Sequence, residues 1–172
     1  METAARSARD VHVADEYLTS VLAGKDYLLF DGAMGTMLQT LGIELEGPAE
    51  LLCLERPEVV TDVHRRYVQA GCMAVTTNTF AASSLKLGDS ASVDDVFAAA
   101  IDCARESGAR YVAADIGPLG ELLEPFGDLE QEEAADLFAE QARAAQAHGA
   151  DIVIIETMAD LAEMRAAVAA AR

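Results

Sequence analysis

Four short apolar segments recur along the chain, and each follows a glycine and ends on a polar residue. The segments are GKDYLLFD, GCMAVTTN, GARYVAAD and GADIVIIE, which begin at Gly24, Gly71, Gly108 and Gly149. Their apolar residues run without polar alternation, as is typical of strands covered on both faces. The starts lie 47, 37 and 41 residues apart, a period that fits one strand, one helix and two loops. The pattern therefore predicts a series of βα units.

Segments with helical periodicity separate these predicted strands. Pro57 suits the first turn of one helix, and Ser92 can cap another, with Asp95 three residues further on. Three of the glycines follow such a segment and fit the left-handed position that ends a helix. The predicted helices begin at Pro57 and near Ser92, cover residues 132–148 and run from about Asp160 to Arg172, with a leading helix from about Ala14 to Leu22 before a first strand at 28–30.

The polar residues at the ends of the four segments are candidates for a shared site. Asp31, Asn78, Asp115 and Glu156 each lie seven positions after the glycine. Ligands of parallel α/β proteins bind at the carboxyl ends of the strands, in open sheets and in barrels alike. We therefore expect these four side chains to surround one functional mouth.

The number of units leaves two architectures open. Alternating strands and helices indicate a parallel sheet with right-handed crossovers. A complete eightfold barrel takes about 250 residues, whereas this sequence has 172. Periodicity alone is compatible with a small doubly wound sheet and with half of a barrel.

Charge and composition exclude several kinds of partner. The chain has 30 acidic and 12 basic residues, for a formal net charge of −18. Such a surface repels nucleic acid and anionic lipid. No apolar run approaches the roughly 20 residues of a membrane helix, and the N-terminal sequence lacks the apolar middle of a secretory signal. We expect a cytoplasmic protein whose partners are small molecules or other proteins, with no nucleic acid and no membrane.

The cysteines and two of the histidines are interpreted as structural residues. The three cysteines are widely spaced, which indicates reduced thiols rather than a disulfide framework. Cys103 and Cys72 are expected to be small core residues, and Cys53 receives no role. His64 is expected to lie partly exposed or to pack on a neighbour, and His148 to occupy a helix C-terminus, where a cation is favourable.

Five motifs in order carry a resemblance to a known family. Together they resemble the homocysteine S-methyltransferase family over about residues 27–172, and the first motif is most similar to the N-terminal homocysteine-binding module of cobalamin-dependent methionine synthases. The motifs are DGAMGTMLQ (31–39), RPEVVTDVHRRYVQAG (56–71), TNTF (77–80), IGPLG (116–120) and IIETMADLAEMRAA (154–167).

The resemblance implies a fold and a domain organisation. Members of this family form a (β/α)8 barrel, so the chain would be α/β, with four βα units of a TIM-type barrel. It would be an incomplete barrel preceded by an N-terminal helix. Residues 1–25 would form an extension with that helix, and residues 26–172 a partial homocysteine-binding barrel domain.

The resemblance also implies a binding site for homocysteine or a related small amino acid. Carried over position by position, Asp31 and Glu156 would hold the substrate ammonium, which needs carboxylate partners when buried. The backbone amides of Gly32 and Ala33 would hold the substrate carboxylate. Thr77 and Asn78 would line the same mouth and orient their neighbours. For Asp115, a loop-capping role and contact with substrate stay equally open.

The sequence departs from the family in its metal ligands. The family binds zinc through three cysteines in GxNC-type and GGCC-type motifs, and neither motif occurs here. Zinc coordination turns a thiol with a pKa near 8.5 into the thiolate that attacks a methyl group. We therefore expect no metal ligand and no catalytic residue in this chain, and cobalamin or methylfolate only through other domains.

The resemblance predicts a homocysteine S-methyltransferase of the methionine synthase type, transferring a methyl group to the homocysteine thiol to form methionine. This chain would carry the amino-acid-binding half. The alternatives are a non-catalytic amino-acid-binding or regulatory module, an inactive fragment of such an enzyme, and an unrelated nucleotide-binding α/β domain, whose G-x-G-x-x-G and P-loop motifs are absent. Because four units leave unpaired strand edges, a second chain supplying the rest of the barrel, or self-association, is a possible partner.

Overall fold

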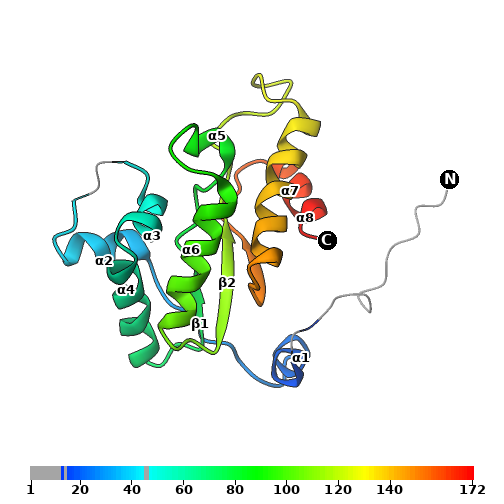
Figure 1. The fold of residues 1–172 in the computed structure, drawn as a ribbon. Helices are drawn as coiled ribbons and strands as arrows, with labels where there is room; N and C mark the ends of the chain where they lie inside the picture. Colours follow the sequence, from blue (N-terminus) through cyan, green and yellow to red (C-terminus); the bar gives the residue numbers. More distant parts are fainter. Residues whose placement is uncertain (1–12, 14, 45–46) are drawn as a thin grey trace.

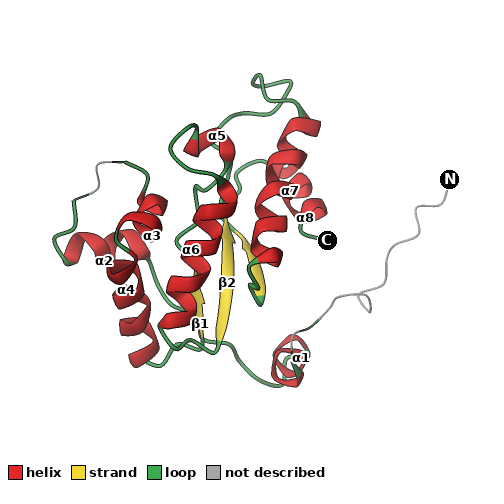
Figure 2. Ribbon diagram, in the orientation of Figure 1, coloured by secondary structure: helices red, strands yellow, loops and turns green. Residues whose placement is uncertain are grey.

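A parallel sheet of three strands forms the centre of the computed structural model, which describes residues 13, 15–44 and 47–172. Strand β2 (Tyr111–Ile116) lies between β1 (Ala74–Thr76) and β3 (Ile152–Ile155). Every residue of β2 is buried, whereas the residues of β3 are intermediate or exposed. The fold is α/β (Figures 1 and 2), and β2 is its buried centre.

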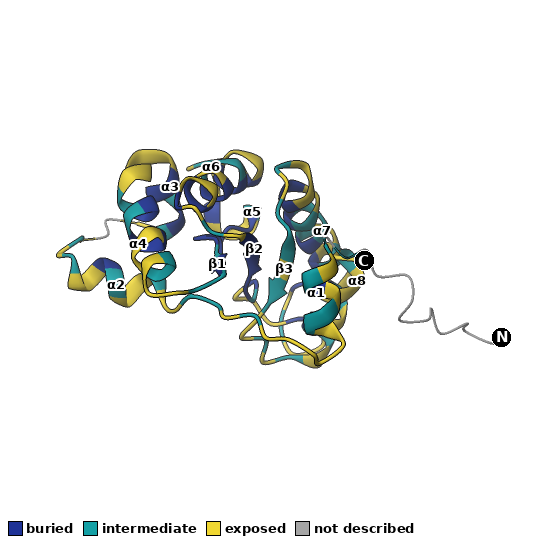
Figure 3. Cartoon of the chain, turned by 90° about the horizontal axis from the view of Figure 1, so that it is seen from below, coloured by how far each residue is buried: buried dark blue, intermediate teal, exposed yellow. Residues whose placement is uncertain are grey.

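The long helices cover one face of this sheet and leave the other face largely free. Figure 3 shows α4, α6 and α7 on the same side of the strands, and the parts of these helices coloured as buried face the strands. The core between the layers includes Phe97 of α6 and Phe138 of α7, both with no exposed surface. The helices are α1 (Glu16–Leu22), α2 (Met34–Thr40), the 3-10 helix η2 (Ala49–Leu51), α3 (Leu52–Glu55), α4 (Pro57–Gln69), α5 (Ser84–Leu87), α6 (Val93–Glu106), α7 (Gln131–Ala147) and α8 (Leu161–Ala170).

The helix starts predicted from the sequence are confirmed at several positions. Pro57 is the first residue of α4. Ser92 caps α6, because its hydroxyl accepts a hydrogen bond from the Asp95 amide at 3.0 Å. Asp160 caps α8 in the same way. The leading helix begins at Glu16, and Ala14 and most of the predicted extension (residues 1–12) lie outside the described residues.

Within the described residues, no helix is both long enough and apolar enough to span a membrane.

The first predicted strand, residues 28–30, is reduced to a single bridge. Phe30 pairs with Ala74 in parallel, and the Asp31 amide donates to the Ala74 carbonyl at 3.1 Å. The segment runs beside β1 in the predicted order but does not extend along it, because Gly32 and Ala33 turn the chain away into α2. The described residues thus contain three βα units with full strands and a fourth segment held at one residue pair.

The register of the sheet differs from the glycine alignment in a way that matters for the site. Ala74 pairs with Tyr111, 37 residues on, which matches the spacing of the two preceding glycines. Ala113 instead pairs with Ile152, only 39 residues on, so Asp115 lies opposite Ile154 and Glu156 extends two residues further. The polar residues were predicted to lie at one level of the sheet, and they do not. The sheet is staggered, a feature that closed barrels require.

Helix α1 packs at the beginning of the strands, at the end of the sheet opposite to the predicted mouth (Figure 1). Leu18 is buried with Ala74 and Tyr111. The Tyr111 hydroxyl donates to the Asp15 carboxylate at 2.6 Å, and this hydrogen bond lowers the pKa of Asp15. The guanidinium of Arg110 lies 4.2 Å from the centre of the Tyr17 ring, where cation–π attraction operates. These contacts fix α1 away from the carboxyl ends of the strands.

Candidate functional site

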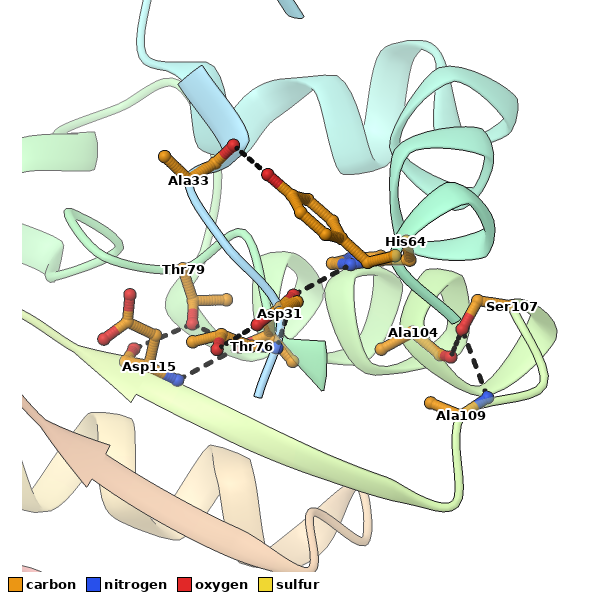
Figure 4. A network of polar contacts seen from close by, with 11 residues as sticks. Asp31, Ala33, His64, Thr76, Thr79, Ala104, Ser107, Ala109 and Asp115 are labelled. Carbon is orange, nitrogen blue, oxygen red and sulfur yellow. Dashed lines mark hydrogen bonds and ion pairs between the residues drawn. The ribbon is translucent and has the colours of Figure 1, made fainter. Parts of the chain in front are cut away.

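Asp31 is held rigidly where the first segment leaves the sheet. One carboxylate oxygen accepts a hydrogen bond from the Thr76 amide at 3.0 Å, and the other accepts one from the Thr76 hydroxyl at 2.7 Å. The side chain is 4% exposed. Figure 4 shows this carboxylate between β1 and helix α4. Asp31 is therefore anchored to the last residue of β1, on the carboxyl side of the sheet.

His64 lies directly behind Asp31, which corrects the expectation that it could be partly exposed. The imidazole has no exposed surface, and its Nδ1 lies 3.8 Å from the nearer Asp31 oxygen (Figure 4). Neither ring nitrogen has a hydrogen-bond partner among the described residues. The sequence did contain a signal, because His64 falls four residues after Val60 on the apolar stripe of α4. The site therefore includes a buried histidine that sequence reasoning left out.

The TNTF motif is tied into the protein by its own hydrogen bonds. The Asp115 amide donates to the Thr77 hydroxyl at 3.1 Å, Thr77 and Thr79 share a hydrogen bond of 2.7 Å, and the Thr79 hydroxyl donates to the Asp115 carbonyl at 2.8 Å. Proton counting then makes Thr77 the donor to Thr79. The Asn78 amide donates to the Ala49 carbonyl at 2.7 Å. Thr77 and Asn78 thus orient neighbouring backbone, and contact of either with substrate stays a prediction.

Asp115 is the carboxyl group of the site whose pKa is clearly shifted. Asp115 is 5% exposed, and its Oδ1 has no hydrogen-bond partner among the described residues. Its pKa is raised from the ordinary 3.8 to about 7, most strongly by burial and then by the negative charges of Glu156, Asp31 and Glu50. Asp31 is hydrogen-bonded to Thr76, Asp115 to Thr77, and the Glu156 amide donates to the Ile116 carbonyl at 3.1 Å, so the three acids lie at the carboxyl ends of neighbouring strands.

Glu156 extends this acidic group from the end of β3. It is exposed and is followed by Thr157, whose φ of 60° lies in the left-handed region. A β-branched residue adopts that conformation only at a cost of about 1–3 kcal/mol, and such strain gathers at functional sites. Glu50 is a second residue that sequence reasoning missed. It is 5% exposed within the apolar stretch GPAELL, and one oxygen accepts from the Ala81 amide at 2.8 Å.

Gly32 and Ala33 form the exposed entrance beside Asp31. The Tyr67 hydroxyl donates to the Ala33 carbonyl at 3.0 Å, and a Cβ at Gly32 would lie 2.9 Å from that hydroxyl. Glycine is therefore required for this close approach. Ala33 is the N-cap of α2, and no described side chain caps that helix. Both residues directly follow Asp31 in the chain, and binding of a carboxylate by their amides stays a prediction.

The IGPLG and TNTF motifs meet through a backbone hydrogen bond. The Gly117 amide donates to the Phe80 carbonyl at 3.0 Å, and a Cβ at Gly117 would lie 2.6 Å from that same oxygen. We expect Gly117→Ala to lower the free energy of unfolding by about 1–3 kcal/mol, because the crowded atom is backbone and cannot move aside. Urea unfolding measures this. The matched control is Gly35→Ala in α2, where nothing lies within 4 Å. An equal change in both variants would contradict the prediction.

The cysteines do not form a metal site. Cys53 and Cys103 are buried in the core cluster around α3, α4 and α6. Hydrogen bonding with Cys103 and burial raise the pKa of Cys53, while burial and the Asp31 charge raise the pKa of Cys72 to about 11. Among the described residues, no three histidine, cysteine or carboxylate groups are placed to hold a metal ion. The acids at the mouth suit a cation that brings its own hydrogen-bond donors, such as an ammonium group.

Comparison with known proteins matches this chain to one family. The profile of the homocysteine S-methyltransferase family matches residues 28–172. The methionine synthase of Mycobacterium tuberculosis (strain ATCC 25618 / H37Rv) is 36% identical over 183 residues, which cover 96% of this chain and 15% of that protein. The methionine synthase of Mycobacterium leprae (strain TN) is 34% identical with the same coverage. The chain thus spans about 15% of the length of these relatives.

Solved structures agree with the fold. The crystal structure of the homocysteine methyltransferase MmuM from Escherichia coli in its oxidized form matches with a TM-score of 0.74 and 23% identity, over 88% of this chain and 60% of that one. Its metallated form matches with a TM-score of 0.70 and 24% identity, over 85% and 59%. Similarity at this level of identity shows a shared arrangement of helices and strands.

Proposed function

Because the chain belongs to the homocysteine S-methyltransferase family, we propose that its acidic mouth binds homocysteine for methylation to methionine. The observation that carries the proposal is the group of carboxylates at the carboxyl ends of the strands, with Asp31 anchored to Thr76 and Glu156 beyond β3. This group offers hydrogen-bond acceptors and negative charge to an ammonium group. The substrate is therefore an amino acid with a free α-ammonium.

The two ends of the amino acid would meet different parts of the site. Asp31 and Glu156 would accept hydrogen bonds from the ammonium. The amides of Gly32 and Ala33, at the uncapped start of α2, would donate to the α-carboxylate. Thr77 and Asn78 would support the mouth by keeping β2 and η2 in place through the hydrogen bonds described above.

The described residues do not fit the zinc that the family resemblance implies. The metal would supply a thiolate by coordinating the homocysteine sulfur. Cys53 and Cys103 lie in the core, and no described group of three side chains can hold a metal. We therefore derive no metal step for these residues. In an assembly of the methionine synthase type, zinc and cobalamin or methylfolate would be held by other parts.

Isothermal titration calorimetry with L-homocysteine tests the binding proposal. We expect the 172-residue chain to bind L-homocysteine and not N-acetylhomocysteine, because acetylation removes the ammonium charge. ATP serves as the probe for the competing nucleotide-binding function. Binding of ATP without binding of homocysteine would overturn the proposal.

An activity assay separates binding from methyl transfer. With zinc and S-methylmethionine, methyl-cobalamin or methylfolate as donor, we expect no methionine formation above background from the purified chain alone, because its described residues supply no zinc ligand set. Turnover by the purified chain would contradict this. If a second polypeptide restores zinc binding and turnover, the chain is part of an enzyme. If none does, the alternative of a non-catalytic binding or regulatory module is favoured.

We propose that a partner covers the free edge of β3. Within the described residues, β3 pairs only with β2, and an unpaired edge is a site for association. Val153 of β3 is 37% exposed, and Leu161 and Val168 of α8 are 63% and 39% exposed. The partner would be a polypeptide with the remaining strands of a TIM-type barrel, or a second copy. We also propose that this chain is cytoplasmic, a location with which its free thiols agree.

Light scattering during gel filtration tests this edge. We expect the chain to associate, and Val153→Lys to shift it toward the monomer, because a charge at the edge opposes strand pairing. Leu85→Lys is the matched control, since Leu85 is 43% exposed on α5, away from β3. A stable monomer of the unmodified chain would count against both forms of pairing.

A further inference from the structure

We propose that Asp115 is a third carboxylate of the ammonium site, whose free oxygen accepts a hydrogen bond from the substrate's α-ammonium between Asp31 and Glu156. The inference rests on the proposed function and extends it to a residue for which the sequence left substrate contact and loop capping equally open.

Asp115 is fixed on the face of the sheet that the long helices leave free. Its register partner is Ile154, and its flanking residues Ala114 and Ile116 belong to the core on the helix side. Successive side chains of a strand point to opposite faces, so Asp115 points away from the helices. The hydrogen-bond ring with Thr77 and Thr79 immobilises its backbone (Figure 4). The carboxyl group is thus held in place by contacts that leave its own oxygen Oδ1 free.

A free oxygen on a buried carboxyl group needs an explanation. Asp115 is 5% exposed, and Oδ1 has no partner among the described residues. Leaving a buried polar atom unpaired costs free energy, so such atoms in native proteins usually meet a water, an ion or a ligand. By contrast, Glu50 nearby already accepts a hydrogen bond from the Ala81 amide. Among the described acids of the cluster, Asp115 is the one with a buried oxygen that has no hydrogen-bond partner.

The surroundings of Asp115 call for a cation with several donors. The charged groups that act most strongly on it are Glu156 from the end of β3, Asp31 from the first segment and Glu50 from η2, and all are acidic. His64 lies behind Asp31, 3.8 Å from its carboxylate. An ammonium group has three N–H donors, which equals the number of carboxylates at Asp31, Asp115 and Glu156. The described residues offer no metal-binding triad that would compete for this role.

The titration of Asp115 supplies a signature of ammonium binding. Burial, together with the neighbouring acids, raises its pKa to about 7 in the free chain. A bound ammonium favours the ionised form and lowers that pKa. Binding therefore releases protons when the pH is below 7, and affinity rises as the pH approaches and passes 7. A carboxyl group that served only the fold would show neither effect.

Calorimetry with L-methionine tests the inference, because methionine carries the ammonium but no titrating thiol. We expect the affinity of the wild-type chain to rise between pH 5.5 and 7.5. At pH 7.5, Asp115→Asn is expected to bind about tenfold more weakly, the effect of one charge-assisted hydrogen bond, and at pH 5.5 the two affinities should converge. Asp136→Asn on α7 removes an equal charge from an exposed position and should behave as wild type.

A measurement on the wild-type chain alone guards against a variant that fails to fold. Titrations at pH 6.0 in two buffers of different ionisation enthalpy report the protons released on binding. We expect release of a fraction of one proton per methionine. Binding without proton release, or equal affinity and pH dependence in Asp115→Asn, would overturn the role of Asp115 and leave the proposed function intact. Absence of methionine and homocysteine binding by the wild-type chain would overturn both.

Discussion

Asp31→Asn is expected to weaken homocysteine binding at least a hundredfold. The substitution keeps the size of the side chain and one acceptor for Thr76, but it removes the negative charge that faces the substrate ammonium. Removing one partner of a buried, hydrogen-bonded charge pair costs about 2–5 kcal/mol, and about 2.7 kcal/mol is already a hundredfold in affinity. The anchoring of Asp31 by the Thr76 amide and hydroxyl makes this loss difficult to compensate by movement. Calorimetry with L-homocysteine at pH 7.5 measures it.

The control for Asp31→Asn must separate lost charge from lost fold. Asp136→Asn changes the net charge equally at an exposed site on α7, and we expect its affinity to match wild type. Circular dichroism should show unchanged helix content in both variants, because Asp31 lies in no helix or strand. If Asp31→Asn binds homocysteine within threefold of wild type while folded, the ammonium does not sit on this carboxylate.

Asp115→Asn is expected to stabilise the chain at pH 8 while it weakens ligand binding. The pKa of Asp115 is raised from 3.8 to about 7 in the folded chain, first by burial and then by Glu156 and Asp31. The folded state therefore holds the proton more tightly than the unfolded state. The resulting stability is fully present below pH 4 and is lost as the pH rises through 7. At about 1.4 kcal/mol per pKa unit, the charged side chain costs on the order of 4 kcal/mol at pH 8.

Thermal unfolding at two pH values measures this difference. We expect the melting temperature of Asp115→Asn to exceed that of wild type by several degrees at pH 8, since 1 kcal/mol corresponds to about 2–4 °C at this size. Near pH 5 the difference should shrink, because wild-type Asp115 is then protonated. A variant less stable than wild type at pH 8 would contradict the buried, unpaired carboxylate. The expected pattern, stability gained where binding is lost, is common at functional sites.

Local signals in the sequence were sufficient for the helices that carry the fold. Pro57, Ser92 and Asp160 mark helix starts through the chemistry of the first turn, and each lies where the structure begins a helix. The four-residue helix α5 was not predicted, because so few residues give too little periodicity. The first segment had the composition of a strand, but the turn at Gly32 removes it from β1 after one residue pair.

The sequence placed the acids at strand ends, but it did not show at which level of the sheet each one lies. Strand-end acids could be found because the carboxyl ends of parallel strands share one edge. The stagger between β2 and β3 could not, since it depends on pairing rather than on spacing along the chain. His64 and Glu50 were missed for a related reason. Each is a polar residue buried by tertiary packing, and the sequence shows only that it lies in an apolar context.

A crystal structure of the chain with bound L-homocysteine would show whether the substrate ammonium lies on these acids. We expect the ligand nitrogen about 2.7–2.9 Å from carboxylate oxygens of both Asp31 and Glu156, the distance of charge-assisted hydrogen bonds, with the α-carboxylate toward Gly32 and Ala33. A ligand bound elsewhere, or bound at this mouth with its nitrogen turned away from both acids, would contradict this expectation.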